Sequence, residues 1–190
     1  MMAKIKTGDG FAGTLIYALD LKQRNHKEVR FLATEGVDLR FTHGKDGKPN
    51  YDIKAMSRDF HLQAKLNPKV SKPVKHIFLS WPEEDLSRLT DQEMMSAARE
   101  YMKRMGYVNT QFIAVRHLEK NNPHLHLVIN AVNNDGRKIS DRTNGSAVVG
   151  YARTSPSKGT SPSGSTSRSA RRKTSRPKRR GPDTRSRKKP

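Results

Sequence analysis

The stretch Arg116–Asn130, RHLEKNNPHLHLVIN, holds three of the seven histidines of the chain within ten residues. Its middle segment, EKNNP, has the Asn and Pro content of a turn. Apolar residues of strand character lie on both sides, in TQFIAVRHL and HLHLVINAV. The pattern predicts two strands that return on each other as a hairpin, which must find further strands and helices to bury its apolar side chains.

The predicted hairpin brings three imidazoles together. His124 and His126 share a face because side chains two apart on a strand project together, and His117 returns opposite His124. Three neutral imidazoles from two strands can hold one divalent cation and leave coordination positions open. Glu119 is a candidate to orient a ligand, and Asn130 shares the strand face of His124 and His126. The alternative is a set of solvated or hydrogen-bonded histidines without a metal. The remaining histidines, His26, His43, His61 and His76, are expected to lie outside the site.

Strands and helices alternate along the rest of the chain before residue 140. Strands are predicted in MMAKIK, around Arg30–Ala33 and in VKHIFLSW, and helices in FAGTLIYALD, in YDIKAMSRDFHLQAKLN before Pro68, and in SRLTDQEMMSAAREYMKRM. Thr90 and Glu93 form a capping box for the last helix, and Gly106 ends it. HGKDGKPN is predicted to be a loop. This order of elements indicates an α+β sandwich with a largely antiparallel sheet and helices packed on it.

The charge of the chain points to an anionic partner. The formal net charge is +20 and the pI is about 10.5, as expected of nucleic-acid binding. Residues 151–190 hold 14 Lys and Arg against one acid, a net of +13, and residues 1–150 hold 24 against 17, a net of +7. The front part is therefore basic on its own. Residues 154–190 are Ser, Thr, Pro, Gly, Arg and Lys with little to bury, so a disordered basic tail is expected.

Several classes of protein are excluded by composition. The chain has no cysteine, which rules out disulfides and thiolate metal sites and fits a reducing compartment. No apolar run reaches the roughly 18 residues that a membrane span needs, and the start of the chain lacks a signal-peptide pattern. A soluble, intracellular protein is expected.

Histidines and a basic chain together raise phosphoryl transfer as an activity. A metal held by histidines polarises a phosphodiester, and a tyrosine hydroxyl attacks it. Tyr17 is the candidate nucleophile because its helix follows a Gly-rich turn and begins near the first strand. The alternative is that Tyr17 is a core residue of that helix. The other tyrosines, Tyr51, Tyr101, Tyr107 and Tyr151, have no better claim.

The sequence resembles the relaxases, or mobilization proteins, of Bacteroides-type conjugative and mobilizable elements, within the histidine–hydrophobe–histidine endonucleases. From about Met2 to Asp141 the matching segments, in the family's order, are FAGTLIYAL, FLATEGV, QAKLNPKVSKPVKHIFLSW, RLTDQEM, YMKRMGYVNTQFIAVRH, PHLHLVIN and NNDGRKISD. The resemblance implies a central antiparallel sheet with helices on both sides. It also implies that Tyr17 nicks one strand at an origin of transfer and stays linked to the 5′ phosphate, while His117, His124 and His126 bind Mg²⁺ or Mn²⁺.

The order of the motifs and the tail refine this resemblance. Rolling-circle replication initiators use the same chemistry but carry the tyrosine after the histidine pair, so Tyr17 favours a relaxase. Relatives have His-His-Asp where this chain has His117, Leu118 and the longer acid Glu119. After Asp141 the family continues with a helix, and a shifted reading frame of back-translated residues 141–159 resembles that continuation. We therefore expect a relaxase domain at 1–141 that lacks its C-terminal elements, and a frameshift-derived or evolved basic tail at 142–190.

The expected partner is single-stranded DNA at an origin of transfer, with an accessory mobilization protein and a coupling protein, in the bacterial cytoplasm. The predicted phosphate contacts are Lys22, Arg24, Lys54 and Arg116, with solvated surface charges as the alternative. A function of a different class also fits the charge: a non-catalytic, basic protein that binds single-stranded nucleic acid, or an inactive truncated relaxase.

Overall fold

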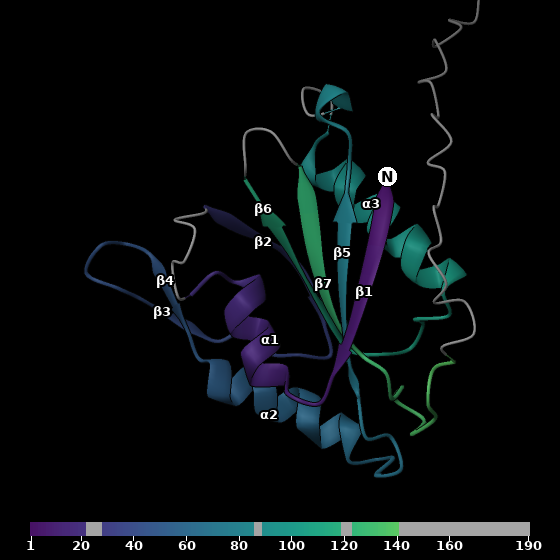
Figure 1. Ribbon diagram of the computed structural model, residues 1–190. Coiled ribbons are helices and arrows are strands. Elements are labelled where there is room, and N and C mark those ends of the chain that lie inside the picture. The colour runs from purple at the N-terminus through teal and green to yellow at the C-terminus, as the bar shows by residue number, and fades with distance from the viewer. Residues whose placement is uncertain (22–27, 86–88, 119–122, 141–190) are drawn as a thin grey trace, which may run out of the picture. The chain divides into compact units, whose positions relative to one another are not determined.

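Five antiparallel strands form the central sheet of the computed structural model, which describes residues 1–21, 28–85, 89–118 and 123–140. The strands lie in the order β1-β5-β7-β6-β2 (Figure 1). Their bounds are Met2–Gly8 (β1), Val29–Glu35 (β2), Val74–Ser80 (β5), Phe112–His117 (β6) and His124–Asn130 (β7). Strands β6 and β7 pair antiparallel with His117 opposite His124. The pairing predicted from the histidine stretch is therefore confirmed.

Helices cover both faces of this sheet, which confirms the predicted α+β sandwich (Figure 1). Helices α1 (Phe11–Ala18) and α2 (Ile53–Ala64) pack on one face, and α3 (Asp91–Arg104) packs on the other. Alternate residues of β6 and β7 enter two separate apolar clusters because side chains of a strand alternate between faces. We call the two sides the α1/α2 face, with Val115 and Val128, and the α3 face, with Ala114 and Leu127.

Helix α3 forms as its sequence predicts. The Thr90 hydroxyl accepts the amide of Glu93 (3.2 Å), and a carboxylate oxygen of Glu93 accepts the amide of Thr90 (2.8 Å), which completes the capping box. Gly106 follows the helix at φ 76°, a conformation that glycine adopts without strain. The buried residues of the helix are Met94, Ala97, Ala98, Tyr101 and Met102.

Helix α1 ends one residue after Tyr17 in a defined cap. The amide of Leu21 donates to the carbonyl of Ile16 (3.1 Å), and the amide of Asp20 donates to the carbonyl of Tyr17 (3.2 Å). This is the Schellman pattern, and Asp20 takes the left-handed φ of 48° that the pattern requires. The backbone that carries Tyr17 is thus held by the cap as well as by the helix.

The expected loop HGKDGKPN is partly wrong. Strands β3 (Phe41–His43) and β4 (Pro49–Tyr51) form a small hairpin within and beside it. The amide of Gly44 donates to the carbonyl of Lys48 (2.8 Å), and Gly47 lies at φ 74°. The Asp-Gly pair in this segment is a hairpin signal, but the polar composition of the segment led to the prediction of a loop.

Other boundaries differ less. Strand β2 is longer than the predicted Arg30–Ala33. None of the helices in the described ranges is long and apolar enough to cross a membrane. The predicted tail, residues 142–190, lies outside the described residues, so its disorder and its boundary at residue 141 stay predictions.

Candidate metal centre and tyrosine site

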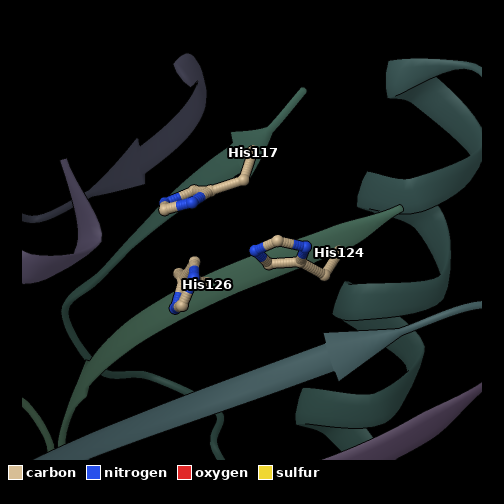
Figure 2. Close-up of side chains that lie close together, drawn as sticks. All are labelled: His117, His124 and His126. Atoms are coloured by element: carbon tan, nitrogen blue, oxygen red, sulfur yellow. The ribbon is translucent and has the colours of Figure 1, made fainter. Parts of the chain in front are cut away.

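Three buried imidazoles converge on the α1/α2 face near one end of β6 and β7. Figure 2 shows His117 on β6 and His124 and His126 on β7 pointing toward one another. Their ligand atoms all lie within 4.8 Å of one another, and the ring centroids of His117 and His126 are 4.2 Å apart. None of the three side chains is more than 4 % exposed. The structure therefore brings together the three histidines that the hairpin argument selected.

The orientation of His117 is fixed by the helix that carries Tyr17. Its Nε2–H donates to the carbonyl oxygen of Ala18, the last residue of α1, over 2.7 Å. A neutral imidazole with a proton on Nε2 keeps its lone pair on Nδ1. His117 thus presents Nδ1 as a ligand atom, and the same hydrogen bond ties the histidine set to the end of α1.

Tyr17 reaches the histidines from α1. Phe11, Leu15 and Ala18 form the buried side of this helix, while the Tyr17 side chain is 61 % exposed. Its ring meets the edge of the His126 ring at a centroid distance of 5.7 Å, with an interplanar angle of 79°. Tyr17 is therefore an exposed aromatic hydroxyl beside the cluster, and the alternative that it is a core residue is wrong.

A fourth histidine belongs to this site, which corrects the expectation that His76 lies outside it. His76 is on β5, the neighbour of β7, and its Nε2 lies 2.8 Å from Nδ1 of His126. Its ring is 5.5 Å from that of Tyr17. Burial lowers the pKa of His76 to about 4, with a smaller contribution from the positive charge of Lys6, so the ring is neutral at pH 7.

A pocket of about 210 Å³ opens beside these groups. It is lined by Lys4, Lys6, Tyr17, His76, Phe78 and His126. Lys4 and Lys6 are exposed residues of β1 that stand directly across from Phe78 and His76 on β5. Phe78 packs against the ring of His124 at 4.6 Å. Sequence reasoning missed both lysines and Phe78. The alternation Val74, His76, Phe78, Ser80 along β5 was a signal, although it needed the strand order to become useful.

Two predicted residues are placed away from the histidines. Arg116 follows the strand alternation to the α3 face, where its side chain is 11 % exposed and donates to the carboxylate of Asp91 (2.6 Å). Asn130 is buried and shares the α1/α2 face, but its amide donates to the carbonyl of Phe60 (2.9 Å), and its oxygen accepts the amide of Val132 (3.1 Å). These contacts explain both residues as structural parts of the sheet and its junction with α2.

The other predicted residues have no described place near the cluster. Lys54 is exposed in the first turn of α2. Glu119, Lys22 and Arg24 lie outside the described residues, so their predicted roles stay predictions.

The histidine set fits a divalent metal ion. Among the described residues it consists of imidazoles alone, with no carboxylate. Nitrogen ligands of this kind suit first-row transition ions, whereas Mg²⁺ binds mainly through oxygens. The three ligand atoms lie within 4.8 Å of one another, so the three residues are close enough together to act as ligands of one ion. The donor set therefore fits a divalent metal ion, and the choice between Mg²⁺ and Mn²⁺ stays a prediction.

Comparison with known families supports a nuclease site. Residues 36–154 match the family described as "Relaxase: MobA/VirD2-like, nuclease domain". The matched range spans more than half of the chain and contains His76 and the three clustered histidines, whereas β1, α1 and Tyr17 precede it. A comparison with curated proteins gave no significant match.

Proposed function

Since the chain belongs to the relaxase family of MobA/VirD2-like nuclease domains, we propose that it nicks one DNA strand at an origin of transfer with Tyr17 as the nucleophile. The observation that carries this proposal is the placement of the Tyr17 ring beside His126, within a cluster that fits a divalent ion. The product is a 5′-phosphotyrosyl intermediate for mobilization of a plasmid or transposon.

The chemistry assigns a separate task to each group. The hydroxyl of Tyr17 loses its proton and its oxygen forms a bond to phosphorus, while the bond from phosphorus to the 3′ oxygen breaks and that oxygen takes up a proton. One ester replaces another, so the step is reversible and the strand can be rejoined. His117, His124 and His126 would hold the ion, whose positive charge stabilises the charge that develops on the phosphate oxygens. The exposure of Tyr17 leaves its hydroxyl accessible to a strand that lies over the sheet.

Among the described residues that line the pocket, the cations come from β1. Lys4 and Lys6 line the same pocket as Tyr17 and are exposed, so we propose that they contact phosphates of the bound strand. Phe78, a partly exposed residue in the lining of the pocket, offers a ring on which a base can stack. Lys22 and Arg24, which lie outside the described residues, stay proposed contacts of the same kind.

The decisive experiment is Tyr17→Phe in the full chain. The protein is incubated with an origin oligonucleotide and Mn²⁺, and a denaturing gel reports protein joined to DNA. We expect wild type to form the adduct, and Tyr17→Phe to form none while it still binds the oligonucleotide, because only the attacking oxygen is removed. Tyr51→Phe is the matched control, since Tyr51 lies in β4 rather than at the cluster.

The outcomes separate the candidate functions. An adduct that survives Tyr17→Phe would refute Tyr17 as the nucleophile. Binding without any adduct in wild type would favour the non-catalytic binding protein or an inactive truncated relaxase. The nucleotide sequence of the gene tests the frameshift proposal: an alternate frame from about codon 142 should encode the helix that the family carries there. Accessory and coupling proteins, and a bacterial cytoplasmic location, remain part of the proposal.

A further inference from the structure

His76 makes a direct hydrogen bond to one of the three clustered histidines. Its Nε2 lies 2.8 Å from Nδ1 of His126, and the two rings stack with an interplanar angle of 24°. The two residues are held on adjacent strands, since Phe78 pairs with His126 and His76 lies two residues before Phe78 on the same face. The contact is therefore built by the sheet register and does not depend on a loop.

The hydrogen bond decides which nitrogen of His126 can bind a metal ion. Nδ1 faces His76, so only Nε2 of His126 is left to point into the cluster. A ligand nitrogen must carry a lone pair, and a neutral imidazole carries its single proton on the other nitrogen. In the metal-binding tautomer, Nδ1–H of His126 is the donor and Nε2 of His76 is the acceptor. The opposite arrangement, with His76 as donor, would place the proton of His126 on Nε2 and block ligation.

We propose that His76 is a positioning residue that accepts the Nδ1–H of His126 and so holds His126 in the tautomer and orientation that bind a divalent cation. The inference rests on the proposed function, because it concerns the same histidine cluster. Metal-binding histidines commonly donate their second nitrogen to a carboxylate, a carbonyl or water. His117 follows this rule with the carbonyl of Ala18, and in this chain a neutral imidazole takes that place for His126.

The surroundings of His76 suit an acceptor. Its ring contacts the rings of both His126, at 5.0 Å, and Tyr17, which meets it edge-on at 5.5 Å. The residue of β1 that pairs with His76 is Lys6. Its ammonium group only donates hydrogen bonds, so it cannot accept one from His126. Phe78, the next residue on this face, touches the His126 ring only through its own ring, at 5.2 Å. None of these neighbours can replace the acceptor atom that His76 provides.

The test compares His76→Leu and His76→Gln in the full chain by Mn²⁺ titration. Leucine has a side chain of similar size but no hydrogen-bond acceptor. The amide oxygen of glutamine can accept the hydrogen bond in place of Nε2. We expect Mn²⁺ affinity to fall by about 10–100-fold in His76→Leu, the range for loss of such a partner, and to return most of the way in His76→Gln. His61→Leu is the matched control, since His61 on α2 bonds to Ser57 and not to the cluster.

A second measurement needs no metal. Long-range ¹H–¹⁵N NMR spectra of the metal-free chain report the tautomer of His126, expected to be Nδ1–H in wild type and Nε2–H in His76→Leu. Wild-type Mn²⁺ affinity in His76→Leu, equal losses in both His76 variants, or an Nε2–H tautomer in wild type would each overturn the role of His76. A wild-type chain that shows the Nδ1–H tautomer but binds no Mn²⁺ would instead refute the metal site of the proposed function and leave the hydrogen bond in place.

Discussion

The two faces of the β6–β7 ladder differ sharply although the same strands make both. On the α3 face, Leu125, Leu127 and Ile129 are fully buried in an apolar cluster with α3. The alternate positions of β7 face α1 and α2 and hold His124 and His126. Both are buried polar groups, whose burial does not itself stabilise the fold. Because a strand alternates faces, one hairpin can stabilise the fold with one set of side chains and reserve the other set for chemistry. Stability and function should then be separable by neighbouring mutations.

Leu125→Ala should break the stabilising side of this comparison. Leu125 is 0 % exposed and lies one residue before His126. Removing its side chain leaves a cavity against α3, so the free energy of unfolding should fall by about 2–5 kcal/mol. Urea unfolding of the metal-free protein measures the loss. Below the onset of unfolding, Mn²⁺ affinity should stay near wild type. A large loss of metal affinity in the folded variant would show that the two faces are coupled.

His124→Ala should break the functional side. One of three ligands is lost, so Mn²⁺ affinity should fall by more than about 100-fold, beyond the loss expected for an outer partner. The free energy of unfolding without metal should change by less than about 1 kcal/mol, because no apolar core is opened. Calorimetric titration and urea unfolding of the same samples give both numbers. An unfolding penalty as large as that of Leu125→Ala would contradict the division of labour.

Asp91→Asn tests the polar part of the α3 face. The Asp91 carboxylate accepts hydrogen bonds from Arg116 (2.6 Å) and Arg30 (2.7 Å), and Arg116 is nearly buried. Loss of the charge should cost about 2 kcal/mol, the size of a hydrogen bond to a charged group, with most of it from Arg116 because Arg30 is solvent-screened. Mn²⁺ affinity should not change. Equal stability of the two proteins at pH 7 would show that the ion pairs contribute nothing.

The difference in stability between wild type and Asp91→Asn should also depend on pH. Burial raises the pKa of Asp91, but hydrogen bonds from Arg30 and Arg116 and their charges outweigh it and hold the pKa below the ordinary 3.8. A carboxylate with a lowered folded-state pKa stabilises the fold above its unfolded pKa, and that contribution is lost as pH falls through the folded value. The stability gap between wild type and Asp91→Asn should therefore be complete above about pH 5 and shrink below about pH 4. Urea unfolding from pH 7 to pH 3 measures it.

The fold was largely predictable because its signals are local. The Asn- and Pro-containing turn, the period of two in HLHLVIN and the capping box at Thr90 each depend on a few consecutive residues. Pairing of His117 with His124 followed from the turn. The β3–β4 hairpin was missed because polar loop composition outweighed its short Asp-Gly signal.

The site was predictable only where one hairpin contains it. His76, Lys4 and Lys6 come from strands that join the hairpin through non-local pairing, in the order β1-β5-β7. No local pattern gives that order, so these residues had no visible partner in the sequence. Arg116 shows the complementary point: it is adjacent to His117 in sequence but faces the opposite side of the sheet, because adjacent strand residues alternate between faces. Its side chain pairs with Asp91 there, and its role as a phosphate contact stays a prediction.

Substitution of Lys4 and Lys6 should give the smallest effects, and it tests which face of the sheet the DNA strand follows. Each phosphate contact that a lysine makes to a single strand contributes about 0.7 to the slope of log affinity against log salt. Lys4→Gln and Lys6→Gln should each lower the slope by about that amount, or about 1.4 together. Lys103→Gln is the matched control: it is exposed and removes the same charge from α3, on the opposite side of the sheet. Fluorescence anisotropy with an origin oligonucleotide at several salt concentrations gives the slopes.

Lys54→Gln is a third variant in the same experiment, since Lys54 lies in the first turn of α2. A lower slope in this variant would extend the path of the DNA strand across the α1/α2 face. If Lys103→Gln lowered the slope as much as the β1 variants, charge would act on DNA without regard to face, and the path over β1 and the pocket would have to be abandoned.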